Sequence, residues 1–373
     1  MKILFISLGC DKNLADSETM LGLLASRGYQ IVDTEEDADV IIVNTCCFIH
    51  DAMEESIETI LQMAEYKKSG SLKALIVTGC MAERYREEIT KEIPEVDAVL
   101  GTASYGHILD AVDGALAGQS YLKMEPLDTL PLVNTHRMVT TGGHYAYLKI
   151  AEGCDKHCTY CIIPKLRGNF RSVPMEHLLR EVKQLADDGV KEIILVAQET
   201  TLYGKDLYGE KKLPELLRRL CKISGIRWIR ILYCYPEEIT EELIQTIKEE
   251  PKICHYLDLP IQHASDDVLK RMGRRTSKEE LIHIISRIRE EIPDITLRTT
   301  LITGFPGESK EQHEELMDFV DEMAFGRLGV FTYSAEDGTP AAQMPDQVEE
   351  SVKEARRAEL MELQQEIAFD QAE

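Results

Sequence analysis

Residues 154–161 read Cys-Asp-Lys-His-Cys-Thr-Tyr-Cys, with three cysteines spaced Cys-x3-Cys-x2-Cys. Each iron of a 4Fe–4S cube takes one thiolate, so this spacing predicts that Cys154, Cys158 and Cys161 hold three irons and leave the fourth open to a small molecule. A structural zinc site takes four ligands, commonly as two pairs. No second pair lies nearby, and His157 is cramped between two of the cysteines.

The sequence around this motif alternates between strand-like and helix-like patterns. Six short apolar runs, the first at 145–151, predict a partial (β/α)6 TIM-like barrel over residues 144–345. The chemistry of such barrels lies at the carboxyl ends of the strands, and Cys154 comes three residues after the first run. The other expected strands are 192–198, 228–232, 256–259, 296–302 and 328–333, and the expected helices are 175–187, 214–221, 238–249, 278–291 and 310–323.

Residues 1–122 show a similar alternation and predict an open α/β domain with a parallel sheet. Residues 123–143 contain prolines and glycines without a long apolar period, which favours a linker, and residues 346–373 form an amphipathic helical pattern. The expected N-terminal strands are 3–8, 40–44, 74–78 and 96–100, and the expected helices are 15–27, 53–67 and 84–93. The apolar side of the C-terminal helix is expected to comprise Val352, Ala355, Leu360, Leu363 and Ile367.

A second set of cysteines, Cys10, Cys46 and Cys80, is far apart in sequence but shares one position in the expected fold. Each follows a predicted strand of the first domain, and parallel strands end at the same edge of a sheet, where ligands gather. These thiols are therefore candidates for a second 4Fe–4S cluster with an open iron. The alternative is that some of them are ordinary core residues. Four cysteines remain: Cys47 is adjacent to Cys46 and must point elsewhere, whereas Cys221, Cys234 and Cys254 lack partners at ligand spacing and are expected to be structural.

Composition restricts the possible partners. The 373 residues carry 42 basic and 66 acidic side chains, a formal charge of -24. This balance disfavours broad, non-specific binding to nucleic acid and suits a basic protein partner, although acidity also simply keeps a protein soluble. No apolar run is long enough to span a bilayer, the start does not resemble a signal peptide, and ten cysteines fit a reducing compartment. We therefore expect a soluble, cytoplasmic protein without a membrane partner.

With these motifs assembled, the chain resembles the methylthiotransferases of the radical S-adenosylmethionine (radical SAM) superfamily over essentially its whole length. Within that family, Lys12-Asn13-Leu14 and Asp206-Leu207-Tyr208-Gly209 resemble the RimO branch. The resemblance rests on residues 7–14, 16–18, 44–46, 78–81, 153–161, 163–164, 197–198, 258–263, 304–308 and 333–334.

The resemblance implies an enzyme with two 4Fe–4S clusters and S-adenosyl-L-methionine (SAM). RimO enzymes add a methylthio group to the β-carbon of an aspartate in small ribosomal subunit protein twelve. In such families SAM binds the open iron of the Cys154, Cys158 and Cys161 cluster and is cleaved to a 5′-deoxyadenosyl radical. The other cluster supplies the sulfur, and a second SAM supplies the methyl group. A reductase or other electron donor and a sulfur source are implied as partners. In the family, a C-terminal TRAM domain is expected to follow the helix at residues 346–373, and this sequence does not include it.

Four further residues are candidates for SAM binding. Tyr160 corresponds to an aromatic residue that packs near the adenine in the superfamily, although loop packing is the alternative. Gln198 and Gln262 follow barrel strands and could donate hydrogen bonds to the cofactor, or cap the strands. Gly304 permits a close turn at a ligand, or only a turn.

The basic residues around these motifs have two interpretations each. Arg167 and Arg171 are candidates for binding a carboxylate of SAM or substrate, against a surface role. The basic run 270–275 is expected to be a solvated loop.

Two other functions compete with the RimO-type assignment. A MiaB-type enzyme would methylthiolate an isopentenyl-adenosine in tRNA by the same chemistry, but the acidic balance and the Lys12-Asn13-Leu14 segment disfavour it. A non-catalytic iron–sulfur carrier would hold clusters without turning over SAM.

Overall fold

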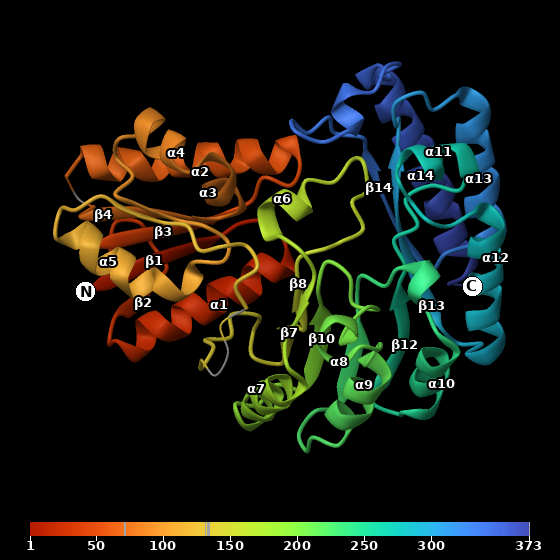
Figure 1. Ribbon diagram of the computed structural model, residues 1–373, viewed down its shortest axis with the longest axis horizontal. Helices are drawn as coiled ribbons and strands as arrows, with labels where there is room; N and C mark the ends of the chain where they lie inside the picture. Colours follow the sequence, from red (N-terminus) through yellow and green to blue (C-terminus); the bar gives the residue numbers. More distant parts are fainter. Residues whose placement is uncertain (71, 131, 133–134, 373) are drawn as a thin grey trace. The chain divides into compact units, whose positions relative to one another are not determined.

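The computed structural model describes residues 1–70, 72–130, 132 and 135–372. Two compact units make up the chain (Figure 1). The first comprises Met1–Cys154 with Ile162–Val190, and the second comprises Asp155–Cys161 with Lys191–Glu373. The domain limits expected from sequence, at residues 122, 143 and 345, stay predictions.

The first unit is built on six parallel strands in the order β2-β1-β3-β4-β5-β6. The two central strands, β3 and β4, are buried along their whole length, which explains why they read as unbroken apolar runs. The strands are β1 (Lys2–Ser7), β2 (Gln30–Val32), β3 (Val40–Thr45), β4 (Ala74–Gly79), β5 (Ala98–Leu100) and β6 (Tyr121–Lys123).

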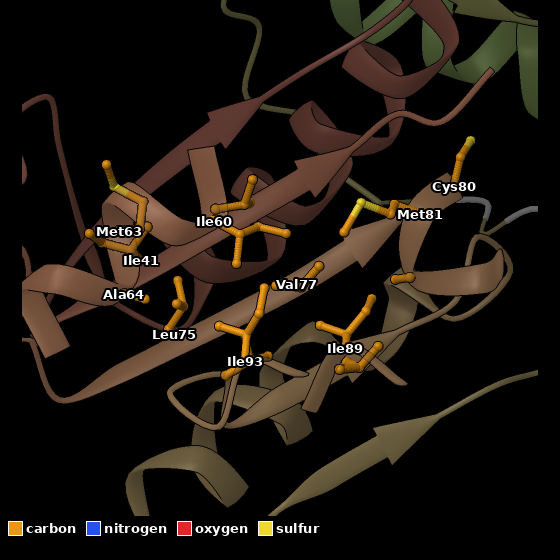
Figure 2. Close-up of a cluster of buried hydrophobic side chains, with 14 of the residues drawn as sticks. Ile41, Ile60, Met63, Ala64, Leu75, Val77, Cys80, Met81, Ile89 and Ile93 are labelled. Atoms are coloured by element: carbon orange, nitrogen blue, oxygen red, sulfur yellow. The ribbon is translucent and has the colours of Figure 1, made fainter. Parts of the chain in front are cut away.

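Helices cover both faces of this sheet. On one face, α1 (Asp11–Ser26) and α5 (Ile108–Leu116) pack against Val40 and Ile42 of β3. Ile41 and Val43 of β3 point to the other face, where they belong to a hydrophobic cluster with Leu75 and Val77 of β4 (Figure 2). The helices on that second face are α2 (His50–Lys68), α3 (Cys80–Tyr85) and α4 (Glu87–Glu92). Because helices cover both faces of the sheet, a ligand is expected to bind at the carboxyl ends of the strands.

The segment between β6 and β7 (Tyr145–Lys149) connects this sheet to the rest of the first unit, and a buried arginine holds it in place. Between these two strands the described residues form no helix or strand, as a linker would. Arg137 in this segment is nevertheless buried, and it forms ion pairs with Glu18 and Glu181, each at 2.6 Å. The remaining elements of the unit are β8 (Ala151–Glu152), α6 (Ile163–Arg167), β9 (Arg171–Ser172) and α7 (Met175–Asp187).

The second unit contains parallel strands in the order β14-β13-β12-β11-β10, with helices between consecutive strands. This is the repeating pattern of a (β/α) barrel, as expected. Its strands are β10 (Glu192–Val196), β11 (Trp228–Ile231), β12 (Ile253–Asp258), β13 (Thr296–Thr303) and β14 (Arg327–Thr332). Its helices are α8 (Lys205–Tyr208), α9 (Leu213–Cys221), α10 (Glu241–Glu249), α11 (Asp266–Arg271), α12 (Lys278–Glu291), α13 (Lys310–Met323) and α14 (Glu350–Asp370).

The C-terminal helix buries only part of the side expected, and Leu363 on that side is half-buried. Leu360 and Ile367 of α14 are buried, but Val352 and Ala355 are exposed, and Lys353 takes their place in the interior. The reason is local, because the Lys353 ammonium group donates a hydrogen bond of 2.9 Å to the Tyr333 carbonyl oxygen. In the part of the chain that the structure describes, no helix is both long enough and apolar enough to cross a membrane.

Candidate active site

The first cysteine triad lies at the carboxyl edge of the first sheet. Cys10 directly precedes α1, Cys46 directly follows β3, and Cys80 opens α3 after β4. The strand order reverses between β1 and β3, and open α/β sheets bind their ligands at such a switch point. The fold therefore brings the three predicted ligands to the edge where a cofactor is expected.

Backbone geometry lets the loops of this triad approach closely. Gly9 has a φ of +86°, and a Cβ atom on it would lie 2.6 Å from Cys46 Cβ and 2.9 Å from Cys46 Sγ. Only glycine fits there without displacing Cys46. Burial, the nearby Cys80 thiol and then the Cys10 thiol raise the pKa of Cys46 to about 12, and burial raises the pKa of Cys80. The three thiols thus act on one another electrostatically, and a positively charged iron core would offset the penalty of ionising them.

Asn13 joins the loops that carry Cys10 and Cys46. Its side-chain amide donates hydrogen bonds to the carbonyl oxygens of Leu8 and Thr45, at 3.0 and 2.8 Å. Asn13 is buried and lies three residues after Cys10 in the same sequence motif. Its two hydrogen bonds give this position of the motif a structural role.

The donor set of the first triad is three cysteine thiols, which as thiolates are the usual ligands of iron–sulfur clusters. Among the described residues, no three His, Cys, Asp or Glu side chains are arranged to hold one metal ion. In a 4Fe–4S cube each thiolate binds a different iron, so three ligands do not need to converge on one point. The assignment of Cys10, Cys46 and Cys80 as cluster ligands stays a prediction that the chemistry of the three thiols fits.

The second triad follows β8. Cys154 belongs to the first unit, where its backbone N–H donates to the Gly168 carbonyl oxygen at 3.1 Å. Cys158 and Cys161 belong to the second unit, and the Cys161 N–H donates to the Cys158 carbonyl oxygen at 3.0 Å. The short segment that carries these two cysteines is held by Thr159, whose N–H donates to the Met272 carbonyl oxygen at 2.9 Å. The role of this triad as cluster ligands also stays a prediction.

Tyr160 is part of an aromatic cluster in the second unit. Its ring meets Phe305 edge-on with 6.5 Å between centroids, and Phe305 meets Tyr333 at 5.3 Å. Burial, and then the Cys158 thiol, raise the pKa of the Tyr160 phenol well above its usual value. These contacts give Tyr160 a packing role, and its predicted contact with adenine stays a prediction.

The three other predicted SAM contacts all follow barrel strands. Gln198 comes after β10 and is half-buried. Gln262 comes after β12 with a φ of +71°, and its Oε1 atom is buried without a hydrogen-bond partner among the described residues. Gly304 comes after β13 with a φ of +71°, and a Cβ atom on it would overlap Lys353 of α14. The absence of a side chain at Gly304 therefore makes room for Lys353 of α14, in the same unit, and its predicted contact with SAM stays a prediction.

Arg274 corrects the expectation of a solvated basic loop at residues 270–275. Its side chain is buried, stacks 4.2 Å from the centroid of Tyr235 and donates to the Pro260 carbonyl oxygen at 2.9 Å. Its Nε and Nη1 atoms have no hydrogen-bond partner among the described residues. A charge run alone did not distinguish this residue from its exposed neighbours. Arg274 thus has buried donors, and Gln262 a buried acceptor, that lack hydrogen-bond partners among the described residues.

Glu199 is another residue that the sequence motifs did not single out. It follows β10, is fully buried, and lies 3.8 Å from the Lys156 ammonium group. Burial raises the pKa of the Glu199 carboxyl group to about 7. Perturbed carboxyl groups at the strand ends of a barrel are typical of ligand sites.

Arg167 also differs from expectation. It is 3% exposed and forms ion pairs with Asp16 at 2.8 Å and Glu152 at 3.1 Å, so it is not a surface charge and it binds carboxylates of the protein itself. Its Nη2 atom lies 3.5 Å from Cys80 Sγ. Arg171 is also buried and donates to the Arg167 carbonyl oxygen at 3.1 Å.

Two known families match separate parts of the sequence. Residues 2–101 match a family described as uncharacterized protein family UPF0004, and residues 148–320 match the radical SAM superfamily. Among solved structures, the radical SAM methyltransferase TsrM from Kitasatospora setae, with tryptophan and a SAM analogue bound, has a TM-score of 0.61 and 12% identity. The match covers 88% of this chain and 72% of TsrM. The fold is thus the expected one, an open α/β domain with a radical SAM barrel.

Curated relatives are much closer in sequence. The ribosomal protein uS12 methylthiotransferase RimO of Lachnoclostridium phytofermentans is 67% identical over 373 residues, which cover all of this chain and 85% of the relative. The RimO protein of Clostridioides difficile is 51% identical over 368 residues, which cover 99% of this chain and 83% of the relative. The chain therefore belongs to the RimO family of radical SAM methylthiotransferases.

Proposed function

We propose that this chain adds a methylthio group to the β-carbon of an aspartate in ribosomal protein uS12, with SAM and two 4Fe–4S clusters as cofactors. The family assignment supports the reaction and the substrate. The observation that carries the proposal within the structure is the position of Cys10, Cys46 and Cys80, each at the carboxyl end of a strand of one sheet. A radical SAM barrel alone has no need for a second thiol triad.

The chain's own residues would bind and shield the reacting groups. Cys154, Cys158 and Cys161 would hold the cluster that leaves an iron open for SAM. Gln262 and Arg274 would satisfy polar groups of SAM with their buried atoms. The bound cofactors would supply radical and methyl-transfer chemistry, which is needed because no acid or base removes hydrogen from an unactivated carbon.

The proposal implies partners and a compartment. An external reductase or other electron donor must reduce the clusters, and a sulfur source must replace each sulfur atom that leaves. None of the ten cysteines forms a disulfide in the structure, which suits a reducing cytoplasm where the ribosomal substrate is made.

An iron count with two neighbouring variants tests the ligand assignment. The parent protein, reconstituted anaerobically, should bind about eight irons, four in each cube. Cys46→Ala should reduce the count to about four, because it removes a ligand of the first triad. Cys47→Ala is the matched control, since Cys47 is adjacent and also buried. An unchanged count in Cys46→Ala would contradict the assignment.

The substrate is tested by mass spectrometry of both candidate targets. The reconstituted chain with SAM and a reductant should add a methylthio group to uS12 and leave tRNA unchanged. Modification of tRNA instead would favour the MiaB-type function. Full cluster content without any 5′-deoxyadenosine would favour an iron–sulfur carrier.

A further inference from the structure

Arg167 contacts a proposed cluster ligand directly. Its Nη2 atom donates a hydrogen bond to Asn13 Oδ1 and lies 3.5 Å from Cys80 Sγ. Its Nη1 atom donates to Asp16 Oδ2 at 2.8 Å and to Glu152 Oε2 at 3.1 Å. All of these residues belong to the first unit. The guanidinium group thus has one edge on two carboxylates and the other on the Asn13 amide oxygen and the Cys80 thiol.

The charges around Arg167 balance without Cys80. Lys149 forms ion pairs with Asp16 and Glu152, so two cations and two carboxylates share one buried network. Neutralising Asp16 and Glu152 engages only the Nη1 atom, whereas Nη2 has two uncharged partners, Asn13 Oδ1 and the Cys80 thiol. The contact with Cys80 therefore calls for its own explanation.

We propose that Arg167 is a positioning residue that raises the reduction potential of the cluster held by Cys10, Cys46 and Cys80. This inference rests on the proposed function, which assigns these cysteines to a cluster. Hydrogen bonds to cluster sulfurs and nearby charge set the potentials of iron–sulfur clusters. A reduced cluster carries one more negative charge, so a cation and an N–H donor at Cys80 stabilise the reduced form more than the oxidised form.

Glu152 should have the opposite effect. Its carboxylate lies on the other Arg167 nitrogen and partly neutralises the guanidinium charge. Replacing it by glutamine removes a negative charge and keeps an oxygen that can accept from Arg167. The structure therefore predicts two changes of opposite sign from residues in direct contact.

The experiment isolates the first cluster. The parent is this 373-residue chain with Cys154, Cys158 and Cys161 replaced by alanine, reconstituted anaerobically, with iron and sulfide counted. The measurement is a redox titration followed by electron paramagnetic resonance. Arg167→Met should lower the ratio of reduced to oxidised cluster at least tenfold at a fixed potential, which corresponds to about 59 mV for one electron. Glu152→Gln should raise that ratio, and Arg167→Lys should restore part of the loss.

Arg137→Met is the matched control. Arg137 is also buried and paired with two carboxylates, but its side chain donates to Glu18, Glu181 and the Tyr147 carbonyl oxygen, not to a cysteine. Its replacement should leave the ratio within about twofold of the parent, since no charge beside the cluster changes.

The outcomes separate this inference from the proposed function. A parent that binds no cluster would overturn the ligand assignment, and this inference with it. A parent with a normal cluster whose ratio is the same in Arg167→Met would overturn this inference alone. If Arg167→Met does not retain a cluster, Glu152→Gln decides, and an unchanged or lowered ratio in that variant would overturn the inference.

Discussion

Glu199 illustrates how burial of one side chain couples stability to pH. Burial raises the pKa of its carboxyl group to about 7, and a hydrogen bond from Thr201 and the charge of Lys156 only partly oppose this. In the unfolded chain the same group has a pKa of about 4.3. Between these values the folded protein binds a proton that the unfolded protein does not. The contribution of Glu199 to the free energy of unfolding is therefore fully present below the unfolded pKa and is lost as the pH rises through about 7.

Glu199→Gln should remove this contribution to the pH dependence of the free energy of unfolding. A difference of nearly three pKa units corresponds to roughly 3–4 kcal/mol of unfolding free energy lost between about pH 4 and 8 in the parent. Urea unfolding at several pH values measures it, and Trp228, the only tryptophan, reports on the second unit that contains Glu199. Glu366→Gln, at an exposed position, is the control and should keep the parental slope. A parental slope in Glu199→Gln would contradict the prediction.

Residue contacts were the part that the sequence could not predict. Arg167 and Cys80 are 87 positions apart, and nothing in either motif specifies that their side chains meet. Arg274 is buried while its neighbour Arg275 is exposed, although both belong to one basic run. A charge pattern reflects composition, whereas burial depends on which long-range neighbours cover a side chain.

At the scale of elements, Gly79 controls where β4 ends and α3 begins. Its φ is +95°, and a Cβ atom there would overlap Asn44 Oδ1 and the Thr45 carbonyl oxygen. Because Cys80 comes next, any shift of this turn also moves a proposed cluster ligand. The turn thus links the geometry of the sheet edge to the cofactor.

Gly79→Ala should destabilise the protein by roughly 1–3 kcal/mol, because it adds both backbone strain and a clash, and it should lower the iron count. Gly189→Ala is the matched control, since Gly189 has a φ of +103° but no atom within 4 Å of the place that an added Cβ would occupy. The control should lose only about 1–2 kcal/mol and retain all its iron. Urea unfolding and iron analysis of both variants measure the difference. Equal iron counts in the two variants would contradict a role of the turn in placing Cys80.

Long elements were predictable because their local signals agree. The helices expected at 175–187, 278–291 and 310–323 have those bounds in the structure, and the last two begin with capping boxes at Ser277 and Ser309. The strands β2 and β6, with three residues each, carry no periodic signal and were not expected. The helix expected at 84–93 is instead two short helices that meet at Arg86, where φ is +46°. The common edge of Cys10, Cys46 and Cys80 was predictable because parallel strands end together.

At the scale of the whole molecule, the net charge of -24 shapes encounters with substrate. A ribosomal protein binds RNA through basic surface, so a uS12 substrate would meet an oppositely charged enzyme. Complementary fields increase the rate of encounter more than the final affinity. Salt shortens the reach of these fields from about 10 Å at 0.1 M to about 3 Å at 1 M.

The apparent second-order rate constant, kcat/KM, for uS12 should therefore fall as salt rises from about 0.05 to about 0.5 M, by roughly tenfold or more. The maximal rate kcat should change little, because the chemistry occurs after docking. Cleavage of SAM without uS12 is the control and should be nearly independent of salt, which excludes a loss of clusters. A salt-independent kcat/KM would contradict the electrostatic contribution, and docking would then depend on local contacts rather than on the overall acidity of the chain.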